Sequence, residues 1–228
     1  MPRPPKNHTS RLPLTRERAL QVAVQLADQG GLEALTMRKL AQTLGVEAMS
    51  LYHHIPGKED ILDGMVEQIF ADMAWQESDP GWKGTMRNRA YRMREVLLLH
   101  PWATALMVSR SRPGAMTLRH LNDTLGCLRA GGFSVALAAH ALSLLDSYIY
   151  GFVMQEVQLP FQNEAEKDQM VTGVLQHMPA DVYPHFVELT LQQVVQPGYR
   201  YGSEFDYGIE LLLDSLELQL QAEMEKQT

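Results

Sequence analysis

The sequence predicts an all-α fold of about nine or ten helices. Apolar residues recur at helical spacing along most of the 228 residues, whereas no segment shows the alternation of a half-buried strand. Glycine and proline separate these apolar segments, and no internal repeat is found. A chain of this length can form one large domain or a small domain followed by a larger one.

The chain is predicted to begin with an arm and a first helix. Residues 1–14 contain proline and basic residues without apolar periodicity, so they are expected to form a flexible arm. Thr15 can cap the first helix, and Gly30-Gly31 ends it. The buried face of this helix is expected to consist of Ala19, Val22, Ala23 and Leu26.

Residues 36–54 are predicted to form two short helices around a glycine turn. Thr36 is a good N-cap, because its hydroxyl can accept a hydrogen bond from a backbone N–H that has no partner within the helix. Gly45 stands where the chain must stop and reverse, a position that often needs positive φ. The inward apolar residues are Leu40, Ala41, Leu44, Val46 and Leu51.

The second of these helices leaves a set of side chains facing outward, namely Ala48, Met49, Ser50, Tyr52 and His53. A helix of this size fits the major groove of DNA. Basic residues bracket the segment, with Arg38 and Lys39 on one side and Lys58 on the other. The pattern therefore favours a DNA-reading helix-turn-helix, although a plain helical hairpin would explain the apolar spacing equally well.

Later helix boundaries follow from glycine, proline and capping residues. The expected helices cover about residues 58–75, 85–100, a short segment from 101, 113–131, 134–158, one or more shorter helices within 164–195, and 204–226. The clearest boundary is residues 78–84, which contain Pro80, Gly81 and Gly84.

The segment from about residue 15 to residue 64 resembles the DNA-binding domain of the tetracycline-repressor (TetR-like) family. The matching residues are Gly30-Gly31-Leu32-Glu33-Ala34-Leu35-Thr36, Arg38-Lys39-Leu40-Ala41, Leu44-Gly45-Val46, Leu51-Tyr52-His53-His54, Lys58 and Leu62. A weaker likeness to the regulatory domain of the tetracycline repressors includes Leu97-Leu98-Leu99-His100, Arg112-Pro113, Gly132-Phe133-Ser134, Ala141-Leu142-Ser143 and Gly151. The resemblance implies a flexible arm (1–14), a helix-turn-helix domain (15–64) and a ligand-binding and dimerisation domain (65–228).

The resemblance also implies how the DNA-binding residues divide their roles on a double-stranded operator. Ala48, Met49, Ser50 and His53 would face base edges in the major groove, and Ser50 could instead reach a phosphate. Tyr52, Lys58, Thr36 and Arg38 would reach phosphates, and Arg38 could instead reach a guanine. Packing within the domain is the alternative role for Tyr52. Residues Arg3, Lys6 and Arg11 of the arm would touch phosphates or belong to a disordered tail.

The larger domain is expected to hold a small-molecule effector, apolar or amphipathic, and no cofactor or metal ion. Candidate ligand-binding residues are Met93, Trp102, Met107, Leu125, Leu142, Asp146 and Tyr148. For any one of them, ordinary hydrophobic core is the alternative. Asp146 is flanked by apolar residues, so it needs a partner or a cavity unless it lies on a solvated helix face.

One departure from the tetracycline repressors concerns the histidine that holds a drug-bound magnesium ion there. The best-matching position here is Met107 or its neighbour, and residues 101–114 contain no histidine. The asparagine and phenylalanine that approach the drug align with Arg89 and Met93. The likeness therefore does not extend to a tetracycline–magnesium site.

A homodimer is expected from the helices at about 134–158 and 204–226. The first is apolar nearly all round, and the second carries an apolar stripe of Phe205, Ile209, Leu212, Leu213, Leu216 and Leu220. The resemblance implies that these two helices pair with their copies in a four-helix interface. Packing within one chain is the alternative for that stripe.

Composition is compatible with these expectations. The net charge is −7, but residues 1–60 hold eight Lys and Arg against six Asp and Glu, whereas the rest holds twelve against twenty-one. The DNA-binding end is thus locally basic, and distant repulsion is screened at physiological salt. The lone Cys127 fits a reducing compartment, and neither a secretory signal nor an uninterrupted membrane-span sequence is evident. A cytoplasmic protein without a membrane partner is therefore expected.

An enzyme is the main alternative class of function. The sequence lacks a His-Glu-x-x-His, Gly-x-Gly-x-x-Gly or phosphate-binding loop motif. His53 and His54 are adjacent, so on a helix they point about 100° apart and cannot chelate as an i, i+4 pair would. Cys127 has no evident base partner. A regulator is therefore favoured, with a ligand-independent architectural module of the same fold as a third class.

Overall fold

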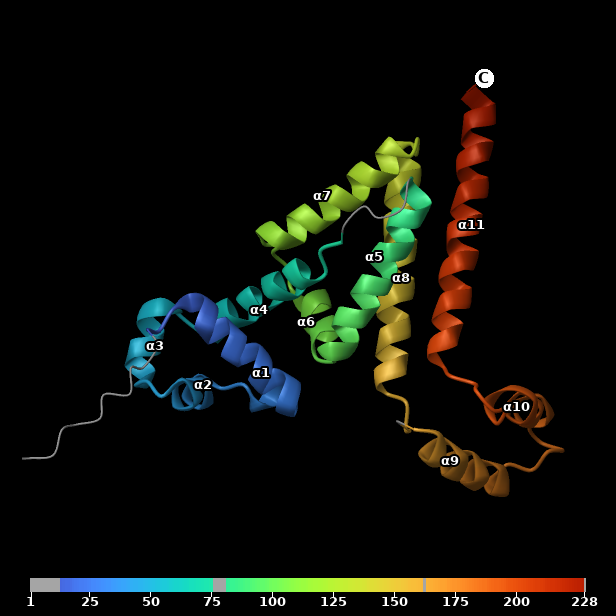
Figure 1. The fold of residues 1–228 in the computed structure, drawn as a ribbon, viewed down its shortest axis with the longest axis horizontal. Coiled ribbons are helices and arrows are strands. Elements are labelled where there is room, and N and C mark those ends of the chain that lie inside the picture. The colour runs from blue at the N-terminus through green and yellow to red at the C-terminus, as the bar shows by residue number, and fades with distance from the viewer. Residues whose placement is uncertain (1–12, 76–80, 162, 228) are drawn as a thin grey trace, which may run out of the picture. The chain divides into compact units, whose positions relative to one another are not determined.

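The computed structural model describes residues 13–75, 81–161 and 163–227 and confirms the all-α fold class (Figure 1). Within these ranges the chain forms eleven α-helices and one π-helical turn, and it has no strand. In chain order they are α1 (Arg16–Ala34), α2 (Met37–Leu44), α3 (Ala48–His54), α4 (Lys58–Asp72), α5 (Trp82–Leu99), α6 (Ala103–Ser109), α7 (Ala115–Ala130), α8 (Val135–Val157), α9 (Glu164–His177), α10 (Pro184–Leu189), the π turn η1 (Thr190–Val194) and α11 (Gly202–Gln227). The predicted basic residues of the arm, Arg3, Lys6 and Arg11, lie outside the described ranges.

The chain divides into two compact units. The first unit consists of Met1–Asp72 and Leu99–Leu118, and it contains α1 to α4 and α6. The second unit consists of Met73–Leu98 and Arg119–Thr228, and it contains α8 to α11. Helices α5 and α7 each run from one unit into the other, since α5 ends at Leu99 and α7 begins at Ala115.

The first unit is built around the contact of α1 with α2 and α4. The hydroxyl of Thr15 accepts a hydrogen bond from the backbone N–H of Arg18 at 3.2 Å, which caps α1 as predicted. The helical geometry of α1 is interrupted at Gly30 and at Gly31, which has a φ of 70°. A Cβ on Gly64 of α4 would lie 2.6 Å from Leu20 Cδ2, so the close approach of α4 to α1 depends on that glycine.

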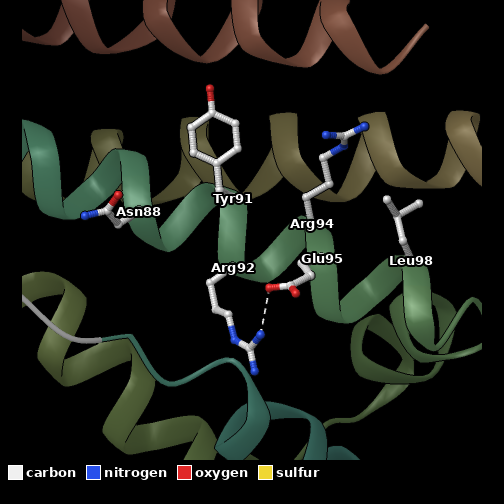
Figure 2. Close-up of a pocket in the computed structure, with 6 residues that line it drawn as sticks. All are labelled: Asn88, Tyr91, Arg92, Arg94, Glu95 and Leu98. Carbon is white, nitrogen blue, oxygen red and sulfur yellow. Dashed lines mark hydrogen bonds and ion pairs between the residues drawn. The ribbon is translucent and has the colours of Figure 1, made fainter. Parts of the chain in front are cut away.

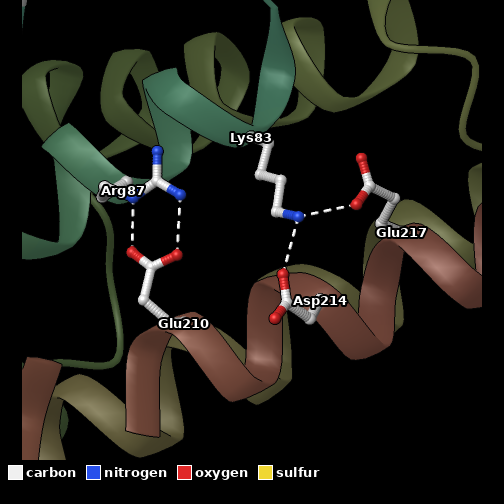
Figure 3. Close-up of polar contacts among 5 residues, drawn as sticks. All are labelled: Lys83, Arg87, Glu210, Asp214 and Glu217. Atoms are coloured by element: carbon white, nitrogen blue, oxygen red, sulfur yellow. Dashed lines mark hydrogen bonds and ion pairs between the residues drawn. The ribbon is translucent and has the colours of Figure 1, made fainter. Parts of the chain in front are cut away.

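In the second unit α5, α8 and α11 lie side by side, and salt bridges join them (Figures 1 and 3). Lys83 contacts Asp214 at 2.7 Å and Glu217 at 2.6 Å, and Arg87 makes a bidentate pair with Glu210. Arg94 makes a second bidentate pair with Glu156 of α8, with distances of 2.8 and 2.5 Å. These pairs fix α5 along α11 and α8, because bidentate geometry restrains orientation as well as distance.

An aromatic cluster fills the contact between α8 and α11. Phe152 of α8 packs against Phe205 and Tyr201, with ring centroids 5.2 and 5.0 Å apart. Tyr148 stacks on Phe205 at 5.5 Å, and its hydroxyl donates to the carbonyls of Glu204 and Phe205. Burial raises the pKa of Tyr148 to about 12, so this hydroxyl keeps its proton and remains a donor at neutral pH.

Helix α8 is long and apolar enough, by length and composition, to cross a membrane. In the second unit, however, one face of this helix is buried. Buried residues recur along it, among them Leu137, Ala141, Leu145 and Ile149. Asp146, in the middle of the helix, is ion-paired with Arg89.

The predicted apolar stripe of α11 packs within the chain, which was the alternative to a dimer contact. Phe205, Ile209 and Leu213 are completely buried, and Leu216 and Leu220 are nearly so. A different set of apolar residues on the two long helices is exposed, namely Val135, Leu144, Met154, Val157, Tyr207, Leu211, Leu218 and Met224. Any partner of these helices would therefore meet residues other than the stripe.

Candidate DNA-binding surface and core polar site

The turn between α2 and α3 has the geometry that the sequence predicts. Thr36 caps α2, and its hydroxyl accepts from the backbone N–H of Lys39 at 3.1 Å. Gly45 follows α2 in the left-handed conformation, with φ 70° and ψ 32°. The N–H of Val46 then bonds to the carbonyl of Ala41 at 3.0 Å, which satisfies the end of α2. This turn ends α2 three residues before α3 begins.

Helix α3 presents one buried residue and an outward face. Leu51 is its only buried residue, and Ile55, which follows the helix, is completely buried too. Met49 is 72% exposed and Tyr52 is 44% exposed. All eight residues predicted to contact DNA are exposed, namely Thr36, Arg38, Ala48, Met49, Ser50, Tyr52, His53 and Lys58. The exposure of Tyr52 does not favour the alternative role in packing.

Three basic side chains lie on the helices that flank α3. Arg38, Lys39 and Lys58 make no ion pair with any residue that the structure describes. Arg110 in the same unit behaves differently, because it is paired with two carboxylates. The unpaired cations therefore lie where phosphates of a bound duplex could be neutralised.

Helix α4, which starts at Lys58, is held along one side by hydrogen bonds to Arg110 and to the first turn of α7, which we call the α4 clasp. The carboxylates of the clasp are Glu59, Asp63 and Glu67, which lie four residues apart on α4 and so share one face. Arg110 donates to Glu59 at 2.8 Å and to Asp63 at 2.9 Å.

The other end of the clasp is at the first turn of α7. Glu67 accepts from the backbone N–H of Met116 at 2.6 Å and from the hydroxyl and N–H of Thr117 at 2.8 and 3.2 Å. A carboxylate is favourable at a helix N-terminus because free N–H groups and the helix dipole meet there. The clasp thus ties α4 to both ends of the segment between α6 and α7.

The predicted effector residues are distributed over both units. Trp102 and Met107 belong to the first unit, and the indole N–H of Trp102 donates to Asp28 at 2.7 Å. The remaining residues belong to the second unit, where Met93 is fully buried and Leu125, Leu142 and Tyr148 are half-buried. The bonds of Tyr148 to α11 give that residue a structural role of its own.

Asp146, which is flanked by apolar residues in the sequence, is ion-paired with Arg89. Arg89 Nη2 of α5 donates to its carboxylate at 2.6 Å and also contacts His120 Nε2 of α7 at 3.1 Å. Trp75 packs edge-on against His120 with centroids 4.8 Å apart, and the guanidinium lies 5.8 Å from the indole centroid. We call these four residues the Arg89 cluster. It brings together three helices and the segment after α4, all within the second unit.

The buried setting of the cluster controls its protonation. Burial, followed by the nearby charge of Arg89, lowers the pKa of His120 to about 3, so the imidazole is neutral at pH 7. Burial and the Asp146 carboxylate raise the pKa of Tyr150 on α8. The cluster therefore contains one cation, one anion and neutral rings.

Sequence reasoning missed the Arg89 cluster, apart from Asp146. A signal existed in α7, where His120, Thr124 and Leu128 recur every four residues and are all buried. Arg89 likewise shares a buried face of α5 with Met86 and Met93. Polar residues that recur on the buried face of a helix indicate that they have hydrogen-bond partners in the core.

An open groove runs along α5 in this unit and is lined by Asn88, Tyr91, Arg92, Arg94, Glu95 and Leu98 (Figure 2). Its strongest polar groups are already engaged, because Arg94 pairs with Glu156 and Arg92 donates to Glu95 at 2.7 Å. The Arg89 cluster is therefore the better candidate for ligand recognition. Across the residues that the structure describes, no group of three or more His, Cys, Asp or Glu could hold a metal ion.

Comparison with known families agrees with this architecture. Residues 19–65 match the model of bacterial regulatory proteins of the tetR family, and residues 76–220 match the tetracycline-repressor-like C-terminal domain. The chain belongs to the TetR family and is a transcriptional regulator, not an enzyme.

Individual relatives include regulators of Saccharopolyspora and Streptomyces species. An HTH-type transcriptional regulator of Saccharopolyspora erythraea is 34% identical over 183 residues, which cover 80% of this chain and 77% of that protein. The HTH-type transcriptional repressor DrrR1 of Streptomyces coeruleorubidus is 31% identical over 225 residues, covering 90% and 78%. The structure of ActR from Streptomyces coelicolor in complex with actinorhodin has a TM-score of 0.73 and 27% identity, covering 92% of this chain and 99% of that one.

Proposed function

We propose that this regulator is a repressor that binds a roughly palindromic DNA operator as a homodimer and leaves it when a small-molecule effector binds. The observation that carries the proposal is the outward face of α3 beside Arg38, Lys39 and Lys58, which make no ion pair within the described part of the chain. Such a surface combines groove-sized shape with phosphate-neutralising charge. The name of the relative DrrR1 supports repression.

The exposed residues divide by chemistry into two groups. Ala48 and Met49 offer apolar contact to thymine methyl groups, and Ser50 and His53 offer hydrogen bonds to base edges. Tyr52 and Lys58 would donate to phosphates, as would Arg38 and the N-terminal amides of α2 that follow Thr36. The first group would set sequence preference, and the second would set overall affinity.

A dimer would place two copies of α3 in successive major grooves about 34–36 Å apart. Support comes from the exposed apolar residues of the two long helices. Tyr207, Leu211 and Leu218 fall on one face of α11, since they are four and seven residues apart. A partner with the same surface would bury them, as expected for an interface with two-fold symmetry.

The effector would bind in the second unit, at the Arg89 cluster and the neighbouring candidates Met93 and Leu142. Helix α7 provides the connection to α4, because His120 lies one turn after Met116 and Thr117, which Glu67 holds. A ligand that favours one arrangement of α7 would shift DNA affinity by its differential binding alone. Such coupling amounts to about 1–3 kcal/mol, or roughly 5- to 150-fold in affinity. The complex of ActR with actinorhodin supports an effector for this regulator.

Footprinting on the DNA upstream of the protein's own gene tests the proposal. We expect a protected, roughly palindromic site at physiological salt. General binding that disappears with salt, without any protected site, would overturn the repressor assignment. A protein that binds its operator but responds to no small molecule would instead fit the ligand-independent architectural module.

A further inference from the structure

The Arg89 cluster contains more hydrogen-bond donors than the protein uses. Arginine has five N–H donors and no acceptor. Nη2 of Arg89 engages Asp146 and His120, whereas Nε and Nη1 have no hydrogen-bond partner among the described residues. The residue is nevertheless 0% exposed. Since buried polar groups in native proteins are almost always paired, these donors indicate a site built to receive an acceptor.

His120 accepts one of the hydrogen bonds that Arg89 donates. Because a guanidinium cannot accept, Nε2 of His120 must accept the bond from Arg89, which assigns the ring proton to Nδ1. Its low pKa keeps the ring neutral. Asp146 already balances the charge of Arg89 at 2.6 Å. The cluster therefore needs acceptor atoms and does not require a compensating anion.

Apolar side chains flank this polar centre at helical spacing. Met93 lies one turn after Arg89 on α5, and Leu142 lies one turn before Asp146 on α8. Residues four apart share a helix face, so each polar residue has an apolar neighbour on its own face. The half-buried indole of Trp75 adds a flat surface beside Arg89 and His120.

We propose that the Arg89 cluster recognises the effector through an oxygen acceptor on an aromatic ring, as a ring-bound carbonyl, phenolate or carboxylate. This inference rests on the proposed function and narrows the effector from apolar or amphipathic compounds to aromatic ones that carry such an oxygen. The free N–H groups of Arg89 bind the oxygen, and the ring lies against apolar side chains and the indole. Alkyl-substituted aromatics without an acceptor leave the donors unpaired and bind weakly.

Equilibrium dialysis of the full-length protein without DNA tests this with three probes of similar size, namely 2-acetonaphthone, 2-naphthoate and 2-ethylnaphthalene. The first has a neutral carbonyl, the second a carboxylate and the third no acceptor. We expect at least one acceptor probe to bind about tenfold or more tightly than 2-ethylnaphthalene, which is the usual effect of pairing a charged donor. Which acceptor binds better decides between a neutral and an anionic group. Equal affinity for all three probes, or no binding of either acceptor probe, overturns the inference.

Two variants assign the preference to the cluster. The double variant Arg89→Met with Asp146→Leu replaces the buried pair by apolar groups without leaving a lone charge. Arg89→Lys keeps the charge but lacks the planar fork, and it serves if the double variant does not fold. Both should reduce the preference for the acceptor probe to within about threefold of unity, whereas Arg119→Met, on the exposed face of α7, should leave it unchanged. A preference that survives in a folded Arg89 variant overturns the inference.

Operator binding is measured separately by fluorescence anisotropy, which keeps the two proposals distinguishable. Acceptor-dependent binding to a protein that finds no operator would contradict the proposed function alone. Operator binding that is released by other compounds, together with no acceptor preference in dialysis, would contradict the ligand class alone.

Discussion

Gly114 lies so close to Glu67 that no side chain fits between them, since an added Cβ would stand 2.2 Å from the carboxylate carbon of Glu67. The same carboxylate accepts hydrogen bonds from Met116 and Thr117 in the first turn of α7. Gly114 therefore permits the α4 clasp, and the segment that joins α6 to α7 cannot approach α4 in this way with any larger residue.

Gly114→Ala should displace Glu67 and open this end of the clasp. We expect a loss of about 1–3 kcal/mol in the free energy of unfolding, because charge-assisted hydrogen bonds are lost and a partly buried carboxylate is left without them. Urea unfolding measures the loss. The matched control is Gly126→Ala in α7, where an added Cβ meets nothing within 4 Å, and stability there should hold or rise by up to about 1 kcal/mol. Equal destabilisation by the two variants would show that the clasp is not the cause.

Substitutions on α3 and at Lys58 should affect either the overall affinity for DNA or the sequence preference, depending on the residue. Tyr52→Phe and Lys58→Ala should weaken binding to all duplexes, and Lys58→Ala should reduce the salt dependence by roughly one phosphate contact. Changes at Met49 or His53 should instead alter which bases are preferred, by about 1–3 kcal/mol per affected base pair. Anisotropy titrations against operator variants measure both effects. Lys226→Ala, at the far end of the chain, is the control and should bind normally.

Much of the fold and of the DNA-binding surface could be predicted from local sequence signals, whereas the Arg89 cluster depends on contacts between residues far apart in the sequence. Thr36 and Gly45 determine their own geometry through a cap and a positive φ, so the helix-turn-helix was visible in the sequence. Asp146 signalled a need for a partner, but Arg89 lies 57 positions away and no local rule joins the two. Helices α9 and α10 had no predictable bounds, because their apolar residues form no clear stripe and α10 buries none of its residues.

The exposed apolar face of α11 should support the dimer. Leu218→Arg or Leu211→Arg would place an unpaired charge in the proposed interface, so we expect a shift from dimer to monomer. Sedimentation velocity at micromolar concentration measures this, and a wild-type monomer would contradict the assignment. Val108→Arg, an equally exposed apolar position on α6, should leave the dimer intact. Leu213→Arg is unsuitable, because Leu213 is buried within the chain and its replacement would disrupt folding.

Tetracycline with magnesium should leave DNA binding unchanged. Met107 or its neighbour stands where the tetracycline repressors have a metal-holding histidine, and residues 101–114 contain no histidine. Titration of the protein–operator complex with drug and magnesium tests this by anisotropy. Release at micromolar drug would show that the cluster accepts a metal-bound ligand after all.

His120 should make the protein sensitive to acid. Its folded pKa of about 3 lies below the usual 6.5, so between these values the unfolded state binds a proton that the folded state does not. Stability contributed by the neutral ring is therefore fully present above about pH 6.5 and is lost as pH falls, by up to about 1.4 kcal/mol per pH unit. His120→Asn removes this group, so the stability difference between the variant and the wild type should shift in favour of the variant from pH 7 to pH 4. Urea unfolding at each pH provides the measurement, and parallel curves for the wild type and His120→Asn would contradict a neutral, buried His120.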